Sequence, residues 1–270
     1  MTFQQTGPTS RRFEISGVLN AMGKAVGGNP VVFFGLALLL QGVPTAVVGL
    51  IQFSYVGPMY QGGNFMPTTD FADMGRIWAM TAIGLLVSVI STNVLQAALT
   101  HGVVASLTGR KASFQECLAS GLRFFLPALG IGIISGLCMI VGFVFFIVPG
   151  VLIALTWCVS VPVAVSEGRG VFQSLGRSGF LTDGHKGAIF LLFLIYVGIS
   201  WVLSLLAGAI GGAFMAISMQ AYLLVVGVIA SPIVSAVASV FGASGAAAIY
   251  YELRSAKEGV GAEQLAQVFE

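Results

Sequence analysis

Charged side chains are rare in this chain, and many of them are concentrated in one short stretch. Only 8 % of the 270 residues are charged. Between two long apolar runs the chain nevertheless contains six ionisable residues, which are Glu167, Arg169, Arg177, Asp183, His185 and Lys186. Such a group could perform acid–base chemistry, form an internal network of ion pairs or bind an anion.

The residue types favour a structural or binding role over catalysis. We predict an ion pair between Glu167 and Arg177, because a partly buried pair would orient this segment against its neighbours. The alternative is a lipid headgroup or protein partner bound by Arg169, Arg177, Ser178 and Lys186, since a guanidinium group makes paired hydrogen bonds with phosphate. We expect no catalytic residues, because the chain contains no clear pair of nucleophile and base.

A second polar group lies inside an apolar run. Asn93, Gln96 and Thr100 recur at helical spacing and form a polar stripe on one face of a helix. In a membrane such side chains bond to neighbouring helices, which is our favoured interpretation, and a polar cavity is the functional alternative. We expect His101 to be a hydrogen-bonded residue, because no second histidine or carboxylate lies nearby at ligand spacing. The sequence predicts no metal site and no cofactor.

The composition indicates what kind of protein positions these groups. Hydrophobic residues make up 57 % of the chain, and the mean hydropathy is +0.96. These values lie outside the range of soluble domains and predict an integral membrane protein. The net charge is only +2 and no basic cluster occurs, so we expect no nucleic-acid partner. Three cysteines without metal-ligand spacing predict neither a disulfide framework nor a zinc site.

Six apolar segments approach the length needed to cross a bilayer, which is about 20 residues. They are Pro30–Phe53, Ile77–Leu99, Leu126–Val148, Val151–Val165, Ala188–Ile210 and Ala221–Gly242. We expect the short fourth span to extend to Glu167, a hairpin turn at Val148–Gly150 and a kink at Ser231–Pro232. The predicted single domain consists of an N-terminal helix within residues 1–29, a bundle over residues 30–252 and a tail of residues 253–270.

The placement of Lys and Arg predicts the orientation of the bundle. With six spans, both termini lie on one side of the membrane. Of the 12 Lys and Arg residues, all except Arg76 lie in segments on that side. The positive-inside rule then makes both termini cytoplasmic, in a bacterial-type inner membrane. The tail Ala262–Glu270 is expected to form a short helix that docks on the bundle or on a partner.

Three amphipathic segments begin with phenylalanine, and each leads into two spans. Their apolar stripes are Phe13, Val18, Met22 and Val26; Phe114, Cys117, Leu118 and Leu122; and Phe172, Leu175 and Phe180. Short helices of this kind lie in the headgroup layer of a membrane. We predict an all-α membrane protein with three cytoplasmic interfacial helices, Ser113 as the N-cap of the second, and a threefold internal repeat.

The stretch Pro162–Ile189 carries a resemblance to a known family. It resembles the pattern P-x-x-x-x-E-x-x-G followed by R-S-x-x-L-T-x-G, which is typical of the YciC-like membrane proteins. The same pattern occurs in the membrane domain attached to some glycerophosphoryl diester phosphodiesterases. The resemblance covers most of the chain from about Phe13 onward. It implies a membrane domain without phosphodiesterase activity, because the catalytic barrel of those enzymes is a separate soluble domain.

These features predict a non-enzymatic membrane protein. Its expected role is to organise lipids, in particular anionic lipids, or a partner protein through its cytoplasmic helices. The partner would be another membrane protein or a second copy of the chain. The alternative is a transporter or channel for a small or amphiphilic solute that uses the polar stripe. No charged residue lies centrally in any span, although ion-coupled carriers usually need one.

Overall fold

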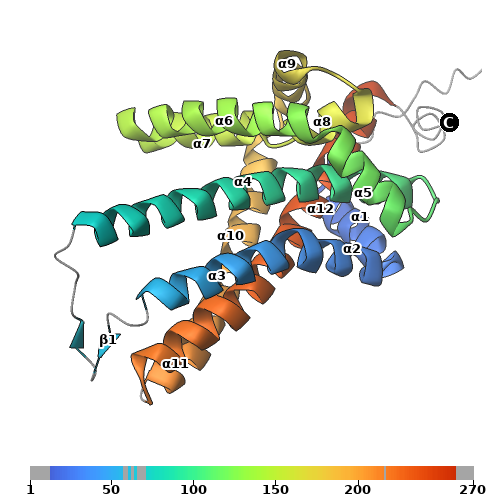
Figure 1. The fold of residues 1–270 in the computed structure, drawn as a ribbon. Helices are drawn as coiled ribbons and strands as arrows, with labels where there is room; N and C mark the ends of the chain where they lie inside the picture. Colours follow the sequence, from blue (N-terminus) through green and yellow to red (C-terminus); the bar gives the residue numbers. More distant parts are fainter. Residues whose placement is uncertain (1–12, 57–59, 62–63, 66–70, 216, 260–270) are drawn as a thin grey trace, which may run out of the picture.

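The computed structural model describes residues 13–56, 60–61, 64–65, 71–215 and 217–259, nearly all of which are helical (Figure 1). Six helical stretches are long and apolar enough to cross a membrane. They are Pro30–Tyr55, Asp73–Leu107, Phe125–Phe145, Ile147–Glu167, Lys186–Met215 and Met219–Glu258. Each coincides with a predicted span, so the protein is an all-α, multi-pass membrane protein. Strands β1 (Tyr60–Gln61) and β2 (Asn64–Phe65) pair antiparallel in the connection after the first span.

The first and sixth spans each contain a π-helical segment. The first consists of α2 (Pro30–Ala37), η1 (Leu38–Gly42) and α3 (Val43–Val56), and the sixth of α11 (Met219–Leu223), η3 (Leu224–Ala230) and α12 (Ser231–Glu258). Each π-helical segment ends two residues before a proline, Pro44 or Pro232. Proline has no N–H for the helical hydrogen bond, and a local widening of the helix accommodates it. The irregularity that we predicted at Pro232 is therefore present, and a second one lies at Pro44.

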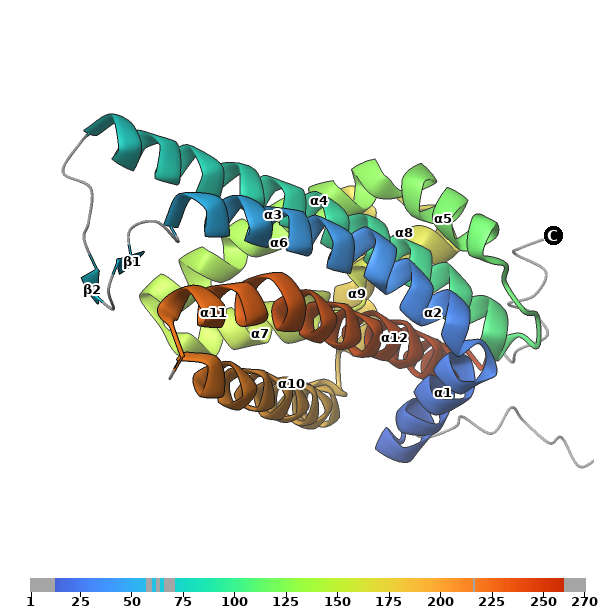
Figure 2. The same cartoon turned by 60° about the horizontal axis from the view of Figure 1, so that its bottom comes forward.

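These two interrupted spans approach each other very closely. Helix α3 contacts η3, and α12 contacts η1. A Cβ atom added to Gly49 would lie 2.4 Å from the carbonyl oxygen of Gly227, so only glycine fits at this crossing. Figure 2 shows α3 beside the sixth span, in which α11 and α12 follow each other in line. This contact joins the first span to the sixth, which are the first and last spans along the chain.

Helix α4 (Phe71–Leu107) forms the second span and is the central element. Its second half is buried against the first and sixth spans, where Leu95, Leu99 and Val103 pack with Phe33 and Val240. Its first half is mostly exposed. The bundle is therefore closely packed near the end of α4 and more open toward β1 and β2, where the helices diverge in Figure 1.

The third and fourth spans form a hairpin of α6 (Phe125–Phe145), α7 (Ile147–Trp157) and α8 (Ser160–Glu167). The turn lies at Phe146 and not at the predicted Val148–Gly150. Pro149 instead takes a place in the first turn of α7, where its missing N–H costs nothing. The fourth span extends to Glu167 as predicted, but it is interrupted before α8. Pro162 explains the interruption, because it cannot donate to the carbonyl four residues earlier.

Helices occupy all three positions predicted for short amphipathic helices, and each is followed by two spans. They are α1 (Ile15–Gly28), α5 (Phe114–Arg123) and α9 (Val171–Thr182); α10 (Lys186–Met215) forms the fifth span. Ser113 caps α5 in a reciprocal capping box with Glu116, as predicted. The location of the three helices at a membrane surface and the threefold repeat stay predictions.

Single residues show where the predicted stripes lie and where the last helix ends. Leu122, Phe172 and Phe180, which we placed in apolar stripes, are not buried in the protein, with exposed fractions of 62 %, 78 % and 57 %, and their contact with a membrane stays a prediction. Helix α12 continues to Glu258, and Leu253 is fully buried, so this helix extends past residue 252, where we placed the end of the bundle. The predicted tail helix Ala262–Glu270 lies outside the described residues, as do Arg11 and Arg12.

Candidate functional site

The turn between α8 and α9 brings together three of the predicted charged residues, Glu167, Arg169 and Arg177. Gly168 ends α8 with φ of +63°, a left-handed conformation that favours glycine. Gly170 then precedes the first residue of α9 in an extended conformation. This short turn reverses the chain so that α9 packs beside α8. We call the end of the bundle formed by this turn and the last turns of α12 the charged end.

Glu167 is the centre of this charged end. Its side chain is only 8 % exposed. One carboxylate oxygen accepts hydrogen bonds from Arg177 Nε at 3.2 Å and from the Tyr250 hydroxyl at 3.1 Å. The other oxygen lies 2.6 Å from Arg169 Nε. The structure therefore contains the ion pair between Glu167 and Arg177 that we predicted, with two further donors on the same carboxylate.

The network continues onto the end of α12. Arg177 also pairs with Glu258, whose second oxygen lies 3.2 Å from Arg254 Nε. Arg254 in turn donates to the Tyr250 hydroxyl at 3.1 Å. We did not predict from the sequence that Tyr250 takes part in this network. The spacing of four between Tyr250, Arg254 and Glu258 was the available signal, because it places all three on one helix face.

This geometry favours a structural function for the charged end. Both oxygens of Glu167 are paired with donors from within the bundle, and these bonds hold the carboxylate in a fixed position between α8, α9 and α12. Arg177 is bound to two carboxylates and its side chain is only 16 % exposed. Arg169 keeps a side chain that is 44 % exposed. An incoming anion could reach Arg169 more readily than Arg177.

Ser178 has a different role from the one predicted. It is fully buried, and its hydroxyl donates to the Thr156 carbonyl oxygen at 2.7 Å. Thr182, one turn later, donates to the same oxygen at 3.3 Å. Thr156 lies at the end of α7, just before the interruption in the fourth span. The hydroxyl groups of α9 thus satisfy a carbonyl at this interruption, and Ser178 is not accessible to a ligand.

The remaining members of the predicted group line the connection from α9 to α10. The His185 ring packs edge-on against Phe13, with 5.4 Å between ring centroids. His185 Nδ1 lies 3.3 Å from the Asp183 carbonyl oxygen. Lys186 is the first residue of α10 and is partly buried. These residues join α1 to α10, and they do not enter the network around Glu167.

The polar stripe on α4 divides into two parts. The Asn93 side chain donates to the Val89 carbonyl oxygen at 2.7 Å. It also packs closely against α6, because a Cβ added to Gly132 would lie 2.9 Å from Asn93 Oδ1. Thr100 is fully buried and donates to the Gln96 carbonyl oxygen at 2.7 Å. These two residues serve packing within and between helices. The Gln96 side chain instead faces a cavity.

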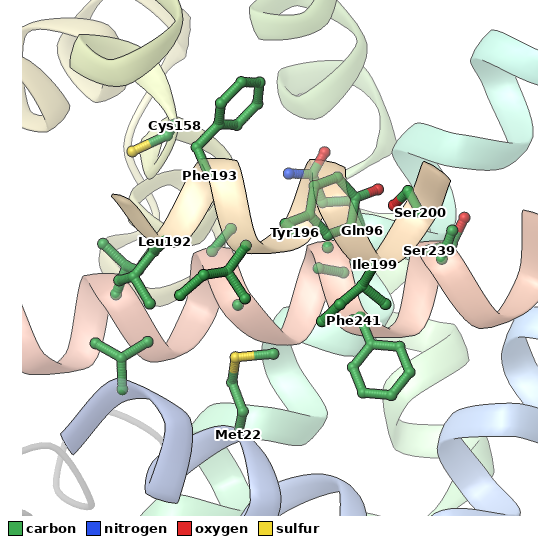
Figure 3. Close-up of a pocket in the computed structure, with 18 of the residues that line it drawn as sticks. Met22, Gln96, Cys158, Leu192, Phe193, Tyr196, Ile199, Ser200, Ser239 and Phe241 are labelled. Carbon is green, nitrogen blue, oxygen red and sulfur yellow. The ribbon is translucent and has the colours of Figure 1, made fainter. Parts of the chain in front are cut away.

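This cavity of about 380 Å³ lies between α10 and the helices α1, α4, α7 and α12. Its volume is within the range of small-molecule sites, which is about 300–1,000 Å³. Most of its lining is apolar, from residues such as Leu95, Leu155, Leu192, Ile199 and Phe241. Figure 3 shows that the polar side chains gather in one part of the cavity, and these are Gln96, Tyr196, Ser200 and Ser239. Met22, Leu192 and Phe193 lie in another part.

The helices place these polar groups through spacing and a glycine. Tyr196 and Ser200 lie one turn apart on α10. The Tyr196 ring packs over Gly242 of α12, where an added Cβ would lie 3.2 Å from the tyrosine hydroxyl oxygen. Within the described part of the chain, the side chains of Gln96, Tyr196, Ser200 and Ser239 make no hydrogen bond. A polar group without a partner inside a membrane protein is costly, so such a cluster points to a ligand.

Comparison of the chain with protein families, with curated proteins and with solved structures found no match. The interpretation of the cavity therefore depends on its own geometry. Gln96 is the predicted residue that lines it, and Tyr196, Ser200 and Ser239 were missed. Their spacing along two separate apolar helices gave no sign that they would meet.

Proposed function

We propose that this protein is a membrane-embedded binding protein for an amphiphilic, lipid-like molecule, which occupies the cavity beside α10. The observation that supports it is the cluster of unpartnered hydrogen-bonding side chains in an otherwise apolar cavity within the spans. The apolar walls give a hydrocarbon chain surroundings as hydrophobic as those it has in the bilayer. The polar cluster offers hydroxyl and amide groups to a polar group on that chain.

The polar group of the bound molecule is uncharged. Among the described residues that line the cavity, none carries a charge. An ion brought to this depth without a countercharge would pay a large desolvation penalty. Hydroxyl, ester and amide groups exchange hydrogen bonds with Gln96, Tyr196 and the two serines at far lower cost. The proposal therefore favours an amphiphile with a hydroxyl-rich or carbonyl-containing polar group.

A second candidate, an anionic lipid headgroup at the charged end, is supported by the exposure of Arg169. A guanidinium group there is suited to phosphate. Lys186, at the start of α10, offers a further positive charge. The motif from Glu167 to Gly184 also supports membership of the YciC-like family of membrane proteins. If the chain belongs to that family, it is a module of the inner membrane that organises lipids or a partner protein and has cytoplasmic termini.

Photocrosslinking tests the cavity. The purified protein is reconstituted with a glucosylceramide that carries a diazirine in its acyl chain, and adducts are mapped by mass spectrometry. We expect saturable labelling of peptides that contain Tyr196 and Ser239, because these peptides also carry apolar wall residues such as Phe193 and Phe241, against which the acyl chain lies. Ser200→Phe should fill the cavity and abolish this labelling. Ser204→Phe, one turn further on α10 and outside the lining, is the matched control.

Labelling spread evenly over all exposed helix surfaces, with no saturation, would refute the cavity site. Loss of a retained anionic lipid in Arg169→Ala, seen by native mass spectrometry of protein extracted gently from its membrane, would support the second candidate.

A further inference from the structure

A second, smaller cavity lies on the same face of α4. It has a volume of about 210 Å³ and lies between α3 and α4, toward the end that carries β1 and β2. Polar residues from both helices line it, namely Thr45, Gln52, Thr81 and Ser88. As in the larger cavity, none of the described lining residues is charged. Both cavities thus combine apolar walls with neutral hydrogen-bonding groups.

One face of α4 connects the two cavities. Thr81 and Ser88 line the smaller cavity, and Thr92 and Gln96 line the larger one. The intervals of seven, four and four residues keep all four side chains on one helix face. From Thr81 to Gln96 this line extends about 22 Å along the helix, at 1.5 Å per residue. It therefore covers most of the hydrocarbon core of a bilayer, which is about 30 Å thick.

A hydrogen bond from the first span reaches α4 at Thr92, which lines the larger cavity one turn after Ser88 of the smaller one. The Thr92 hydroxyl donates to Gln41 Oε1 at 3.1 Å. Gln41 is only 6 % exposed and lies in the π-helical segment η1, and its carbonyl oxygen accepts from Thr45 at 2.7 Å. Ser88 and Thr92 are exposed on the surface of the bundle. The polar line is therefore open sideways to the bilayer along part of its length.

We propose that this line is a path along which the uncharged headgroup of an amphiphile crosses the membrane while its hydrocarbon chain stays in the bilayer. Moving a hydroxyl-bearing headgroup through hydrocarbon is slow, because each hydrogen bond to water is lost without replacement. The Thr81 and Thr92 hydroxyls donate to the Ile77 carbonyl oxygen and to Gln41, so their oxygens remain as acceptors, whereas Ser88 and Gln96 can both donate and accept. Along α4 these groups replace the lost bonds one after another. The inference rests on the proposed function, since the Gln96 end of the path is the binding cavity.

The test measures movement between leaflets in the intact protein. Vesicles of neutral phospholipid contain the full chain and a trace of glucosylceramide with a fluorescent NBD group on its acyl chain. Dithionite, added outside, quenches the outer leaflet at once and inner lipid only as it emerges. We expect the wild-type protein to speed the emergence at least about tenfold over empty vesicles, the effect of a modest lowering of the barrier.

Variants in the smaller cavity separate the path from the binding site. Thr81→Val with Ser88→Ala removes two hydroxyl groups outside the larger cavity, and we expect about tenfold slower emergence with unchanged crosslinking at Tyr196 and Ser239. Thr108→Val with Ser106→Ala removes the same two hydroxyl groups at the other end of α4 and just beyond it, outside both cavities, and should leave the rate unchanged.

Two outcomes would overturn the path. One is wild-type protein that crosslinks in the cavity but moves the probe no faster than empty vesicles, which leaves the binding proposal intact. The other is a Thr81→Val/Ser88→Ala variant as fast as the wild type. If the wild-type protein shows no saturable crosslinking, the binding proposal itself is refuted. The wild-type comparison does not depend on the folding of any variant.

Discussion

At the scale of single residues, the charged end depends on one buried carboxylate. Glu167 receives hydrogen bonds from Arg177 and Tyr250, and Arg169 pairs with its second oxygen. A buried charge is stable only while its partners are present, because its hydration has been lost. Arg177 is the partner that also reaches Glu258, so it links α8, α9 and α12. The same ion pair on a solvated surface would contribute little.

Replacing Arg177 with glutamine should therefore destabilise the protein markedly. Arg177→Gln removes one partner from each of two carboxylates. We expect the free energy of unfolding to fall by up to about 3 kcal/mol. This is at the low end of the usual cost of breaking a buried ion pair, because part of the arginine side chain is exposed. Arg110→Gln is the matched control, since the pair of Arg110 and Glu116 is 54 % and 49 % exposed. That control should cost less than about 1 kcal/mol.

The measurement is the thermal unfolding midpoint of both variants in one detergent. Equal midpoints for the two variants would show that the network around Glu167 does not stabilise the fold.

At the scale of elements, helix α9 is positioned by polar side chains. Its buried face includes Ser174, Ser178 and Thr182, which lie one turn apart. From the sequence we placed the apolar residues Phe172, Leu175 and Phe180 in a stripe that faces the membrane, and we did not predict a polar face buried in the bundle. That face exists because the neighbouring span is interrupted and its Thr156 carbonyl oxygen needs donors. Serine and threonine on α9 supply them, and Phe172 and Phe180 face outward.

The turn before α9 depends on the left-handed conformation of Gly168. Gly168→Ala should destabilise the protein by about 1–2 kcal/mol, because φ of +63° forces a Cβ into the left-handed region. Gly170→Ala is the control. Its φ is −70°, and no atom lies within 4 Å of either added Cβ.

Thermal midpoints of the two alanine variants, measured side by side, decide the matter. A Gly170→Ala variant as unstable as Gly168→Ala would mean that the backbone conformation is not the cause.

At the scale of the whole molecule, close packing is distributed unevenly. The second half of α4 is buried among the first and sixth spans, and its first half is largely exposed. Gly49 and Gly227 approach each other closely where the first span crosses the sixth. The smaller cavity lies beside this crossing, between α3 and α4, and the larger one lies beside the buried half of α4, against α1, α10 and α12.

Gly49→Ala should therefore force these spans apart. The added Cβ would lie 2.4 Å from the backbone oxygen of Gly227, and backbone cannot move aside without shifting a helix. We expect a lower thermal midpoint. Gly212→Ala on α10 is the control, because nothing lies within 4 Å of its Cβ, and alanine there favours the helix by up to about 1 kcal/mol.

Retention of the wild-type midpoint in Gly49→Ala, measured together with Gly212→Ala, would contradict this close crossing.

The number and place of the spans could be predicted from the sequence, because the length of apolar segments reflects the thickness of a bilayer and needs no knowledge of neighbours. The Ser113 cap and the pair of Glu167 with Arg177 were also predictable, since both depend on residues close in the chain. The turn at Phe146 was not predicted, because glycine and proline mark a turn only approximately when proline can enter the first turn of a helix.

The cavity beside α10 was decided only by the tertiary structure. Gln96, Tyr196 and Ser239 come from three helices far apart in the sequence, and nothing local to any of them indicates that they meet. Hydropathy determines that a helix lies in the membrane, but lipid and protein neighbours are equally apolar, so it does not determine which face meets which helix. That choice depends on close fits such as Gly242 against Tyr196 and Gly49 against Gly227, which exist only once the helices are packed.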